Sequence, residues 1–109
     1  MKFNQKYLVT HLKKFKNVSL SFPFGKEVYV FSFNNKMFAL IEKDKTPIRL
    51  SLKCDPKLST ILRERYEEVM PGINLNQRYW NTILITGQLS EKEIEDLIRH
   101  SYELIKVET

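Results

Sequence analysis

The sequence is short of several residue types, and each shortage excludes a class of protein. One cysteine, Cys54, cannot form an internal disulfide, so we expect a reducing compartment. Only three glycines occur, each at a predicted turn, so there is no glycine-rich phosphate-binding loop. No apolar run approaches the roughly 18–20 residues of a membrane span, and the opening MKFNQKYLVTHLKKF lacks the apolar run of a signal peptide. We therefore expect a soluble, cytoplasmic protein with no membrane partner.

Residues that carry chemistry are equally sparse. The two histidines, His11 and His100, stand apart from any HExxH or paired CxxC pattern, so we predict no metal site and no cofactor. Cys54 precedes a predicted helix start, where its pKa could fall, but a lone cysteine is more often a small buried side chain. The acidic clusters at 67–68 and 93–96 are typical of solvated helix faces. We predict that the protein is not an enzyme.

Charge is present but unevenly distributed. Residues 1–53 hold eleven Lys/Arg against three Asp/Glu, a balance of +8, whereas residues 54–109 hold seven against ten, a balance of −3. This asymmetry indicates one basic face suited to a polyanion. The simpler alternative is a lysine-rich surface that only aids solubility.

Length and hydrophobic periodicity predict the architecture. The 109 residues, 42% apolar and 28% charged, fit one globular domain over 1–109. We expect helices at about 4–16, from Asp55 to about Met70, and from Ser90 onward, with strands at 19–25, 27–33, 36–42, 47–53 and about 80–86. Short turns between consecutive strands require antiparallel pairing. The sequence predicts an α+β domain in the order α-β-β-β-β-α-β-α, with an antiparallel sheet of about five strands and helices packed against it.

Local signals support these elements. Asn4 is a candidate N-cap, and Asn34-Asn35 suits a two-residue hairpin turn. Asp55-Pro56 provides an N-cap and a proline at the first helical position. Ser90 and Glu93 form a capping box. The inner side of the second helix is predicted to consist of Leu58, Ile61, Leu62 and Val69, and that of the last helix of Ile94, Leu97, Ile98, Ser101 and Ile105.

The stretch LNQRYWNTILI, residues 75–85, contains the one tryptophan and has two interpretations. Trp80 is a structural clasp if it anchors the preceding loop onto the sheet, with Asn76 and Asn81 satisfying backbone groups. Alternatively, Arg78 meets a phosphate or carboxylate and Tyr79 or Trp80 stacks on a base. The residues alone leave both interpretations open, although they favour the clasp.

Six segments, PFGKEVYVF, KMFAL, LKCDP, LRERYEEVMPG, NQRYWNT and LIRHSYELI, resemble the MmcQ/YjbR-like family in their order and spacing, from about Pro23 to Ile105. The resemblance implies a fold that is CyaY-like or secretion-chaperone-like, and a DNA-binding function with a "double wing" motif. The family motif, structural or binding, falls on Cys54, Asp55, Pro56, Tyr66, Pro71, Gly72, Asn76, Trp80, Asn81 and Thr82.

The leading functional hypothesis is binding of double-stranded DNA by a basic face with hairpin tips as wings. The candidate contact residues are Asn35, Lys36, Lys43, Lys45, Arg49, Lys53 and Arg78. The alternative is a protein-interaction module, chaperone-like or adaptor, that holds a partner without binding nucleic acid. A role as an enzyme ranks third.

Overall fold

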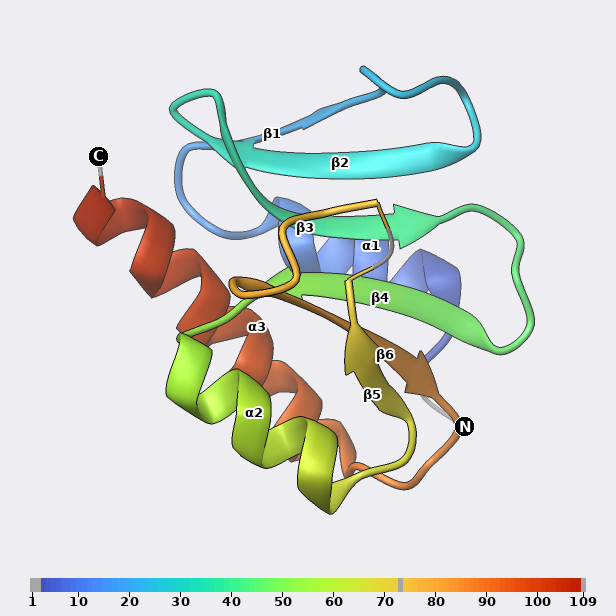
Figure 1. Cartoon of the computed structure of the whole chain (residues 1–109). Coiled ribbons are helices and arrows are strands. Elements are labelled where there is room, and N and C mark those ends of the chain that lie inside the picture. The colour runs from blue at the N-terminus through green and yellow to red at the C-terminus, as the bar shows by residue number, and fades with distance from the viewer. Residues whose placement is uncertain (1–2, 73, 109) are drawn as a thin grey trace.

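The computed structural model describes residues 3–72 and 74–108, which form one six-stranded sheet in the order β1-β2-β3-β4-β6-β5 with three helices around it (Figure 1). All neighbouring strands are antiparallel. The elements are α1 (Gln5–Lys13), β1 (Val18–Ser21), β2 (Val28–Phe33), β3 (Lys36–Glu42), β4 (Ile48–Lys53), α2 (Pro56–Arg65), β5 (Val69–Pro71), β6 (Trp80–Ile85) and α3 (Glu91–Glu108). The predicted α+β class is confirmed.

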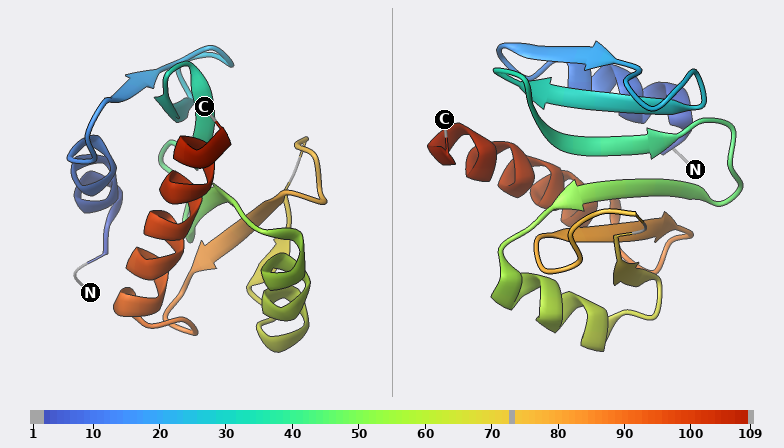
Figure 2. Two further views of the ribbon diagram at one scale, coloured as in Figure 1. Left: turned by 90° about the vertical axis from the view of Figure 1, so that its left-hand side faces the viewer. Right: turned by 45° about the horizontal axis from the view of Figure 1, so that its top comes forward.

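The two faces of the sheet have different coverings. Helices α1 and α3 cover one face, whereas the loop of residues 74–79 lies across the opposite face, which we call the open face (Figure 2). The main core lies under the two helices, because alternate strand residues point toward them. Its fully buried members include Phe31, Phe38, Leu50, Ile83, Leu8, Leu12, Ile94, Ile98 and Ile105. A smaller buried cluster on the open face consists of Val30, Leu40 and Trp80.

Turn and capping residues act as predicted. Asn34 and Asn35 have φ values of 49° and 65°, the left-handed backbone that a tight hairpin turn requires. Asn4 accepts a hydrogen bond from the Tyr7 N–H at 2.7 Å and caps α1. In α3, the Ser90 N–H donates to the Glu93 carboxylate at 2.9 Å and the Glu93 N–H donates to the Ser90 hydroxyl at 3.1 Å. This reciprocal pair is the predicted capping box.

The second helix is shorter than predicted, and this prediction was wrong. It ends at Arg65 because Tyr66 adopts extended backbone angles, φ −125° and ψ 121°. Val69 belongs to β5 and pairs with Ile83, so the sheet gains a sixth strand where the sequence suggested the end of a helix. Ile61, predicted to face inward, is 54% exposed. Pairing with β6 outweighs helical periodicity in this short segment.

The first helix and first strand also end earlier than predicted. Helix α1 stops at Lys13, and Asn17 turns the chain with a φ of 63°. Strand β1 stops at Ser21, because a turn closed by the Gly25 N–H donating to the Phe22 carbonyl at 3.1 Å follows it. As a result, Phe22 and Phe24 lie in an exposed loop rather than in an edge strand.

Candidate nucleic-acid interface

The two hairpin tips that carry the predicted wing residues lie at opposite ends of the sheet (Figure 1). Asn35 lies in the turn before β3, Lys36 is the first residue of that strand, and Lys43 and Lys45 follow its end. With seven residues in β3, a rise of about 3.3 Å per residue separates its ends by about 20 Å. The predicted cations therefore form two groups rather than one continuous cluster.

At the first end, the lysines are occupied by the end of α3. The Lys53 ammonium pairs with the Glu108 carboxylate at 2.9 Å. The Lys36 ammonium donates to the Glu108 carbonyl at 3.2 Å. Only 21% of the Lys53 side chain is exposed. These contacts reduce the charge that the two lysines offer to a phosphate.

Arg78, the remaining predicted cation, lies in the loop before β6. Its guanidinium lies 5.7 Å from the centre of the Tyr79 ring, and both residues are exposed. Because Trp80 pairs with Lys53 across the sheet, Arg78 belongs to the same end as Lys53. It is separated from the β3–β4 turn by the length of the strands.

The second end of the sheet gathers cations from two loops. The Lys43 N–H donates to the Glu27 carbonyl at 2.7 Å, which places the β1–β2 loop, with the exposed Lys26, beside the β3–β4 turn. Arg49 belongs to this end and lies 3.6 Å from Glu42. We call Lys26, Lys43, Lys45 and Arg49 the basic end. Among the ion pairs of the described residues, Arg49 is the one member of this set that takes part.

Helix α1 begins beside the basic end and carries further lysines. The Gln5 side chain accepts from the Asp44 N–H at 2.6 Å and donates to the Asp44 carboxylate at 3.3 Å, so α1 begins beside the β3–β4 turn. The helix and its C-terminal extension carry four exposed lysines, Lys6, Lys13, Lys14 and Lys16. The sequence reasoning did not select them. The signal was available, because no acidic residue precedes Glu27 in the chain.

The Cys54-Asp55-Pro56 part of the family motif begins α2. The Asp55 carboxylate caps the helix by accepting from the Lys57 and Leu58 N–H groups at 3.0 and 3.2 Å, and Pro56 occupies the first helical turn. The Asp55 N–H donates to His100 Nε2 at 3.2 Å, and the Cys54 N–H donates to the Tyr79 carbonyl at 2.8 Å. This segment joins α2, α3 and the loop before β6.

The Cys54 thiol is poorly suited to nucleophilic chemistry. Its side chain is buried, and burial raises its pKa to about 11, assisted by the negative charge of Asp55 and opposed by Arg63. At neutral pH the thiol is protonated, and only the thiolate attacks electrophiles efficiently.

We expect Cys54 in the folded protein to react with iodoacetamide far more slowly at pH 8 than the same thiol in urea, where its pKa returns to about 8.5. Mass spectrometry after a timed reaction measures this difference. The Cys54→Ser variant provides the blank, and we expect it to retain the fold. Equal labelling rates in the folded and unfolded protein would contradict the assignment of a buried, protonated thiol.

Four further motif residues, Gly72, Asn76, Trp80 and Asn81, help to hold the loop before β6 against the sheet and α2. Trp80 is only 7% exposed, and the loop residue Leu75 packs against the cluster that contains it. The backbone at Gly72 lies so close to Trp80 that a Cβ added at Gly72 would be 2.8 Å from the Trp80 Cβ. Asn76 forms the turn at the loop tip, where its side chain accepts from the Arg78 N–H at 3.1 Å. These contacts favour the structural interpretation of Trp80.

Arg63, which sequence reasoning did not select, lies at the centre of this clasp. Its Nε donates to the Asn81 side-chain oxygen at 2.6 Å, and its terminal nitrogen donates to the carbonyls of Gln77 and Trp80, the latter at 3.0 Å. Asn81 is 2% exposed, and its side-chain oxygen also accepts from the Ser59 hydroxyl at 2.8 Å. One guanidinium thus connects α2, the loop and β6.

Three other motif residues have structural partners. The Tyr66 hydroxyl donates to Glu93 at 2.9 Å and ties the end of α2 to the start of α3. Pro71 lies in the edge strand β5, where a missing N–H is tolerated. Thr82 is buried, and its hydroxyl lies 2.8 Å from that of Ser51 on the open face. Of the three, Thr82 also lines a cavity on the open face together with Ser51.

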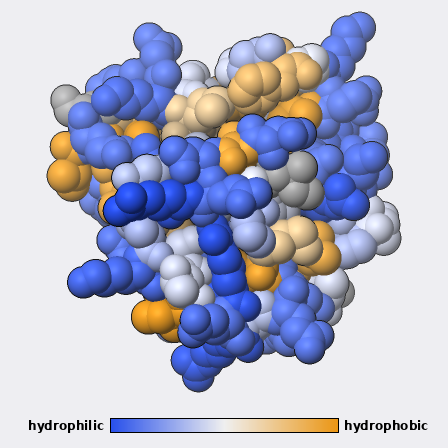
Figure 3. All heavy atoms as spheres, viewed as in Figure 1, coloured by the Kyte–Doolittle hydropathy of each residue, from blue (hydrophilic) through white to orange (hydrophobic). Residues whose placement is uncertain are grey.

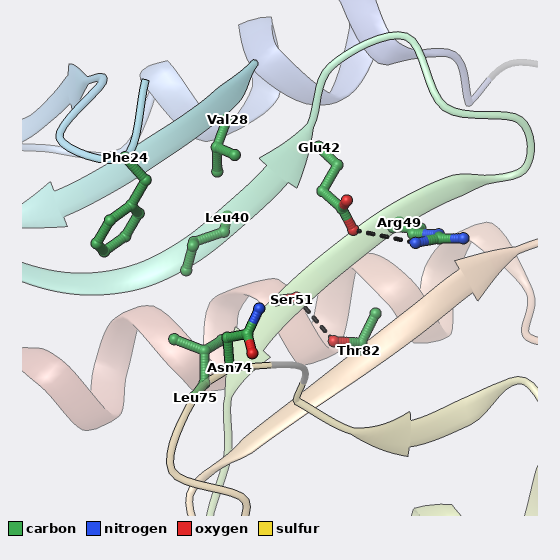
Figure 4. A pocket seen from close by; sticks show the side chains of 9 residues that line it. All are labelled: Phe24, Val28, Leu40, Glu42, Arg49, Ser51, Asn74, Leu75 and Thr82. Carbon is green, nitrogen blue, oxygen red and sulfur yellow. Dashed lines mark hydrogen bonds and ion pairs between the residues drawn. The ribbon is translucent and has the colours of Figure 1, made fainter. Parts of the chain in front are cut away.

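The open face also contains a cavity of about 310 Å³ (Figure 4). Its apolar walls are formed by Phe24, Val28, Leu40 and Leu75, and the Glu42–Arg49 pair lies at one side. Most of this face is hydrophilic, but apolar side chains reach the surface over the β1–β2 loop and the adjoining part of β2 (Figure 3). We call this space the open-face cavity. It was not predicted, because its lining comes from five separate segments of the chain.

No group of three or more His, Cys, Asp or Glu side chains is arranged to hold a metal ion in residues 3–72 and 74–108. None of the helices within these ranges combines the length and apolar character that crossing a bilayer requires.

Comparison with known proteins shows relatives in sequence. The chain is 32% identical over 88 residues to the uncharacterized protein YbdF of Escherichia coli O157:H7, covering 81% of this chain and 72% of that protein. It is 31% identical over 67 residues to the uncharacterized protein YjbR of Escherichia coli K12, covering 62% of this chain and 57% of YjbR. The alignment therefore spans little more than half of YjbR.

Solved structures agree with this relationship. A Deinococcus radiodurans protein with a DUF419 domain is 30% identical, with a TM-score of 0.87 over 92% of this chain and 76% of that one. A Pseudomonas syringae protein is 28% identical, with a TM-score of 0.79 over 94% of this chain and 99% of that one. Residues 13–104 match the YjbR family. This match covers most of the chain and agrees with the motif order, so the protein belongs to the YjbR family.

Proposed function

We propose that this protein binds nucleic acid through the phosphate backbone and performs no catalysis. The observation that carries the proposal is the set of exposed lysines at the basic end and on α1, which outnumber the acidic residues among them, Glu27, Glu42 and Asp44. Lys6, Lys26 and Lys45 are exposed, and the ion pairs of the described residues do not include them. Flexible, solvated ammonium groups of this kind bind phosphates as point charges and release condensed counterions.

Not all of the predicted lysines are expected to contact phosphate. We expect Lys43 and Lys45 to do so, but not Lys36 and Lys53, because Glu108 already binds both. Cys54, the one thiol in the chain, is buried, and its pKa of about 11 keeps it protonated at neutral pH, which supports the proposal that it does not act as a nucleophile.

The test is the salt dependence of duplex DNA binding after Lys43 and Lys45 are changed together to glutamine. Each phosphate contact contributes about −0.9 to the slope of log K against log salt. Losing two contacts should therefore make the slope shallower by up to about 2 and weaken all DNA sequences alike. Fluorescence anisotropy with a labelled duplex at several salt concentrations measures both effects.

A double change of Lys57 and Lys92 to glutamine is the matched control. It removes the same total charge from exposed positions on α2 and α3, so it separates local contact from net charge. We expect its slope to stay close to that of the unchanged protein. A slope that is equally shallow in both double variants, or no binding at low salt, would count against the proposal.

One observation favours the alternative of a protein-interaction module. Phe24 is 58% exposed beside the apolar walls of the open-face cavity, and exposed aromatic side chains commonly anchor protein partners. Under this alternative, a protein partner binds at Phe24. Its affinity should not change when Lys43 and Lys45 are replaced.

A further inference from the structure

We infer that the open-face cavity accommodates one unpaired nucleobase of a single-stranded segment. This inference rests on the proposed nucleic-acid binding and assigns a second type of contact to it. The lysines of the basic end bind phosphates without regard to sequence, whereas the cavity would hold a base.

The walls of the cavity suit a flat aromatic ring. Phe24 leaves 58% of its surface exposed, and it borders the cavity together with Val28, Leu40 and Leu75 (Figure 4). Phe22, only two residues earlier, packs against Tyr29 with ring centres 5.5 Å apart and does not line the cavity. Bases stack on exposed aromatic rings whatever their identity, because every base has a π-face. Phe24 is therefore the available stacking platform.

The Glu42–Arg49 pair suits the edge of a base. The two charged groups are 3.6 Å apart, longer than a normal hydrogen bond, and their side chains are 35% and 42% exposed. Both therefore retain hydrogen-bonding capacity, the carboxylate as an acceptor and the guanidinium as a donor. A nucleobase edge carries hydrogen-bond donors beside acceptors. Such an edge can donate to the Glu42 carboxylate and accept from the Arg49 guanidinium.

The base must be unpaired for this contact to form. In a duplex, the Watson–Crick edge is occupied by the partner base and the ring faces are stacked on their neighbours. Proteins that stack a base on an aromatic side chain and read its edge therefore take it from a single-stranded segment. An apolar peptide side chain would also fit the walls, but it would offer no additional hydrogen-bonding partner to the partly exposed Glu42–Arg49 pair. The charged pair thus favours a base over an apolar peptide.

The chain order connects the two kinds of contact. Glu42 is the last residue of β3, Lys43 and Lys45 lie in the following turn, and Arg49 lies near the start of β4. A single turn therefore presents phosphate-binding lysines beside the groups that face the base. A single strand that crosses this turn places its backbone at the basic end and one base toward the cavity.

The central experiment compares the Phe24→Ala and Phe22→Ala variants as a matched pair. Both remove an exposed phenylalanine from the same loop, but only Phe24 borders the cavity. We expect Phe24→Ala to weaken binding of a labelled single-stranded oligonucleotide about 5- to 150-fold, the effect of losing one stacked base. Phe22→Ala should bind like the unchanged protein. Anisotropy measures affinity, and thermal melts establish that both variants fold.

Two further measurements distinguish a base from the backbone. An oligonucleotide in which every base is replaced by an abasic sugar should bind the unchanged protein about as weakly as the normal strand binds Phe24→Ala. The Phe24→Ala variant should also retain the salt slope, because it loses no phosphate contact. Among homopolymeric strands, Glu42→Gln should change the order of affinities, whereas Lys43→Gln should lower all of them alike.

The outcomes separate this inference from the proposed function. Single-strand binding that is unchanged in Phe24→Ala, with the lysine effect intact, would overturn the base site and leave phosphate binding standing. Failure of single strands and duplexes to bind at low salt would overturn both. A synthetic apolar peptide that binds the cavity more tightly than any strand, and loses affinity in Phe24→Ala, would assign the cavity to a peptide and overturn the inference.

Discussion

Replacing Trp80 with alanine is expected to destabilise the fold by about 3–5 kcal/mol, the usual cost of cutting a buried aromatic side chain to alanine. Trp80 is 7% exposed and packs with Val30 and Leu40 on the open face. Gly72 lies close to the Trp80 side chain and Leu75 packs against its cluster, so the substitution also removes this support for the loop. A loss of this size is a large part of the stability of a small domain.

Urea denaturation of the Trp80→Ala protein measures this loss. Tyr79→Ala is the matched control, because Tyr79 is the adjacent aromatic residue and is 38% exposed. We expect it to change stability by much less. An unchanged free energy of unfolding in Trp80→Ala, accompanied by weaker ligand binding, would instead place Trp80 on the recognition surface.

The second large effect is expected at Asn81. Changing Asn81 to alanine removes the oxygen that accepts from the Ser59 hydroxyl and the Arg63 guanidinium. Each of the two donors left without this partner costs about 1–3 kcal/mol, so we expect a total loss of about 2–6 kcal/mol. Because Arg63 also binds the carbonyls of Gln77 and Trp80, the loss should loosen the loop as well as β6.

A double-mutant cycle of Arg63→Ala and Asn81→Ala tests this arrangement. Residues that share a hydrogen-bond network show interaction energies of about 0.5–3 kcal/mol. Arg65→Ala, an exposed change of the same type on α2, should show no coupling to Asn81→Ala. Strictly additive effects of Arg63→Ala and Asn81→Ala would mean that their contact contributes nothing to stability.

The fold was predictable where local chemistry and hydrophobic pattern agreed. The asparagine turn at 34–35 and the Ser90–Glu93 capping box were correctly predicted, because each depends on a few neighbouring residues. Strand β5 was missed because its three residues are defined by pairing with β6 rather than by their own pattern. A Pro-Gly pair after a helical stretch looks like a helix end, and only tertiary contacts reveal the strand.

The candidate site was predictable only in part. The sequence pointed to Lys43, Lys45 and Arg49, which the structure brings together at one end of the sheet with Lys26. It did not reveal that Glu108, at the far end of α3, engages Lys36 and Lys53. That contact depends on the length and direction of α3, whose residue Glu108 is more than fifty positions from either lysine, and local patterns do not encode it.

The most direct test of the central claim is amide chemical-shift mapping with a short single-stranded oligonucleotide at low salt. We predict the largest changes in the β1–β2 loop, in the β3–β4 turn around Lys43 and Lys45, and near Leu75 beside the cavity. The β3–β4 changes should diminish as salt is raised, because phosphate contacts are salt-dependent. Changes confined to the outer surfaces of α2 and α3, or no change at any oligonucleotide concentration, would contradict nucleic-acid binding at the basic end and the open-face cavity.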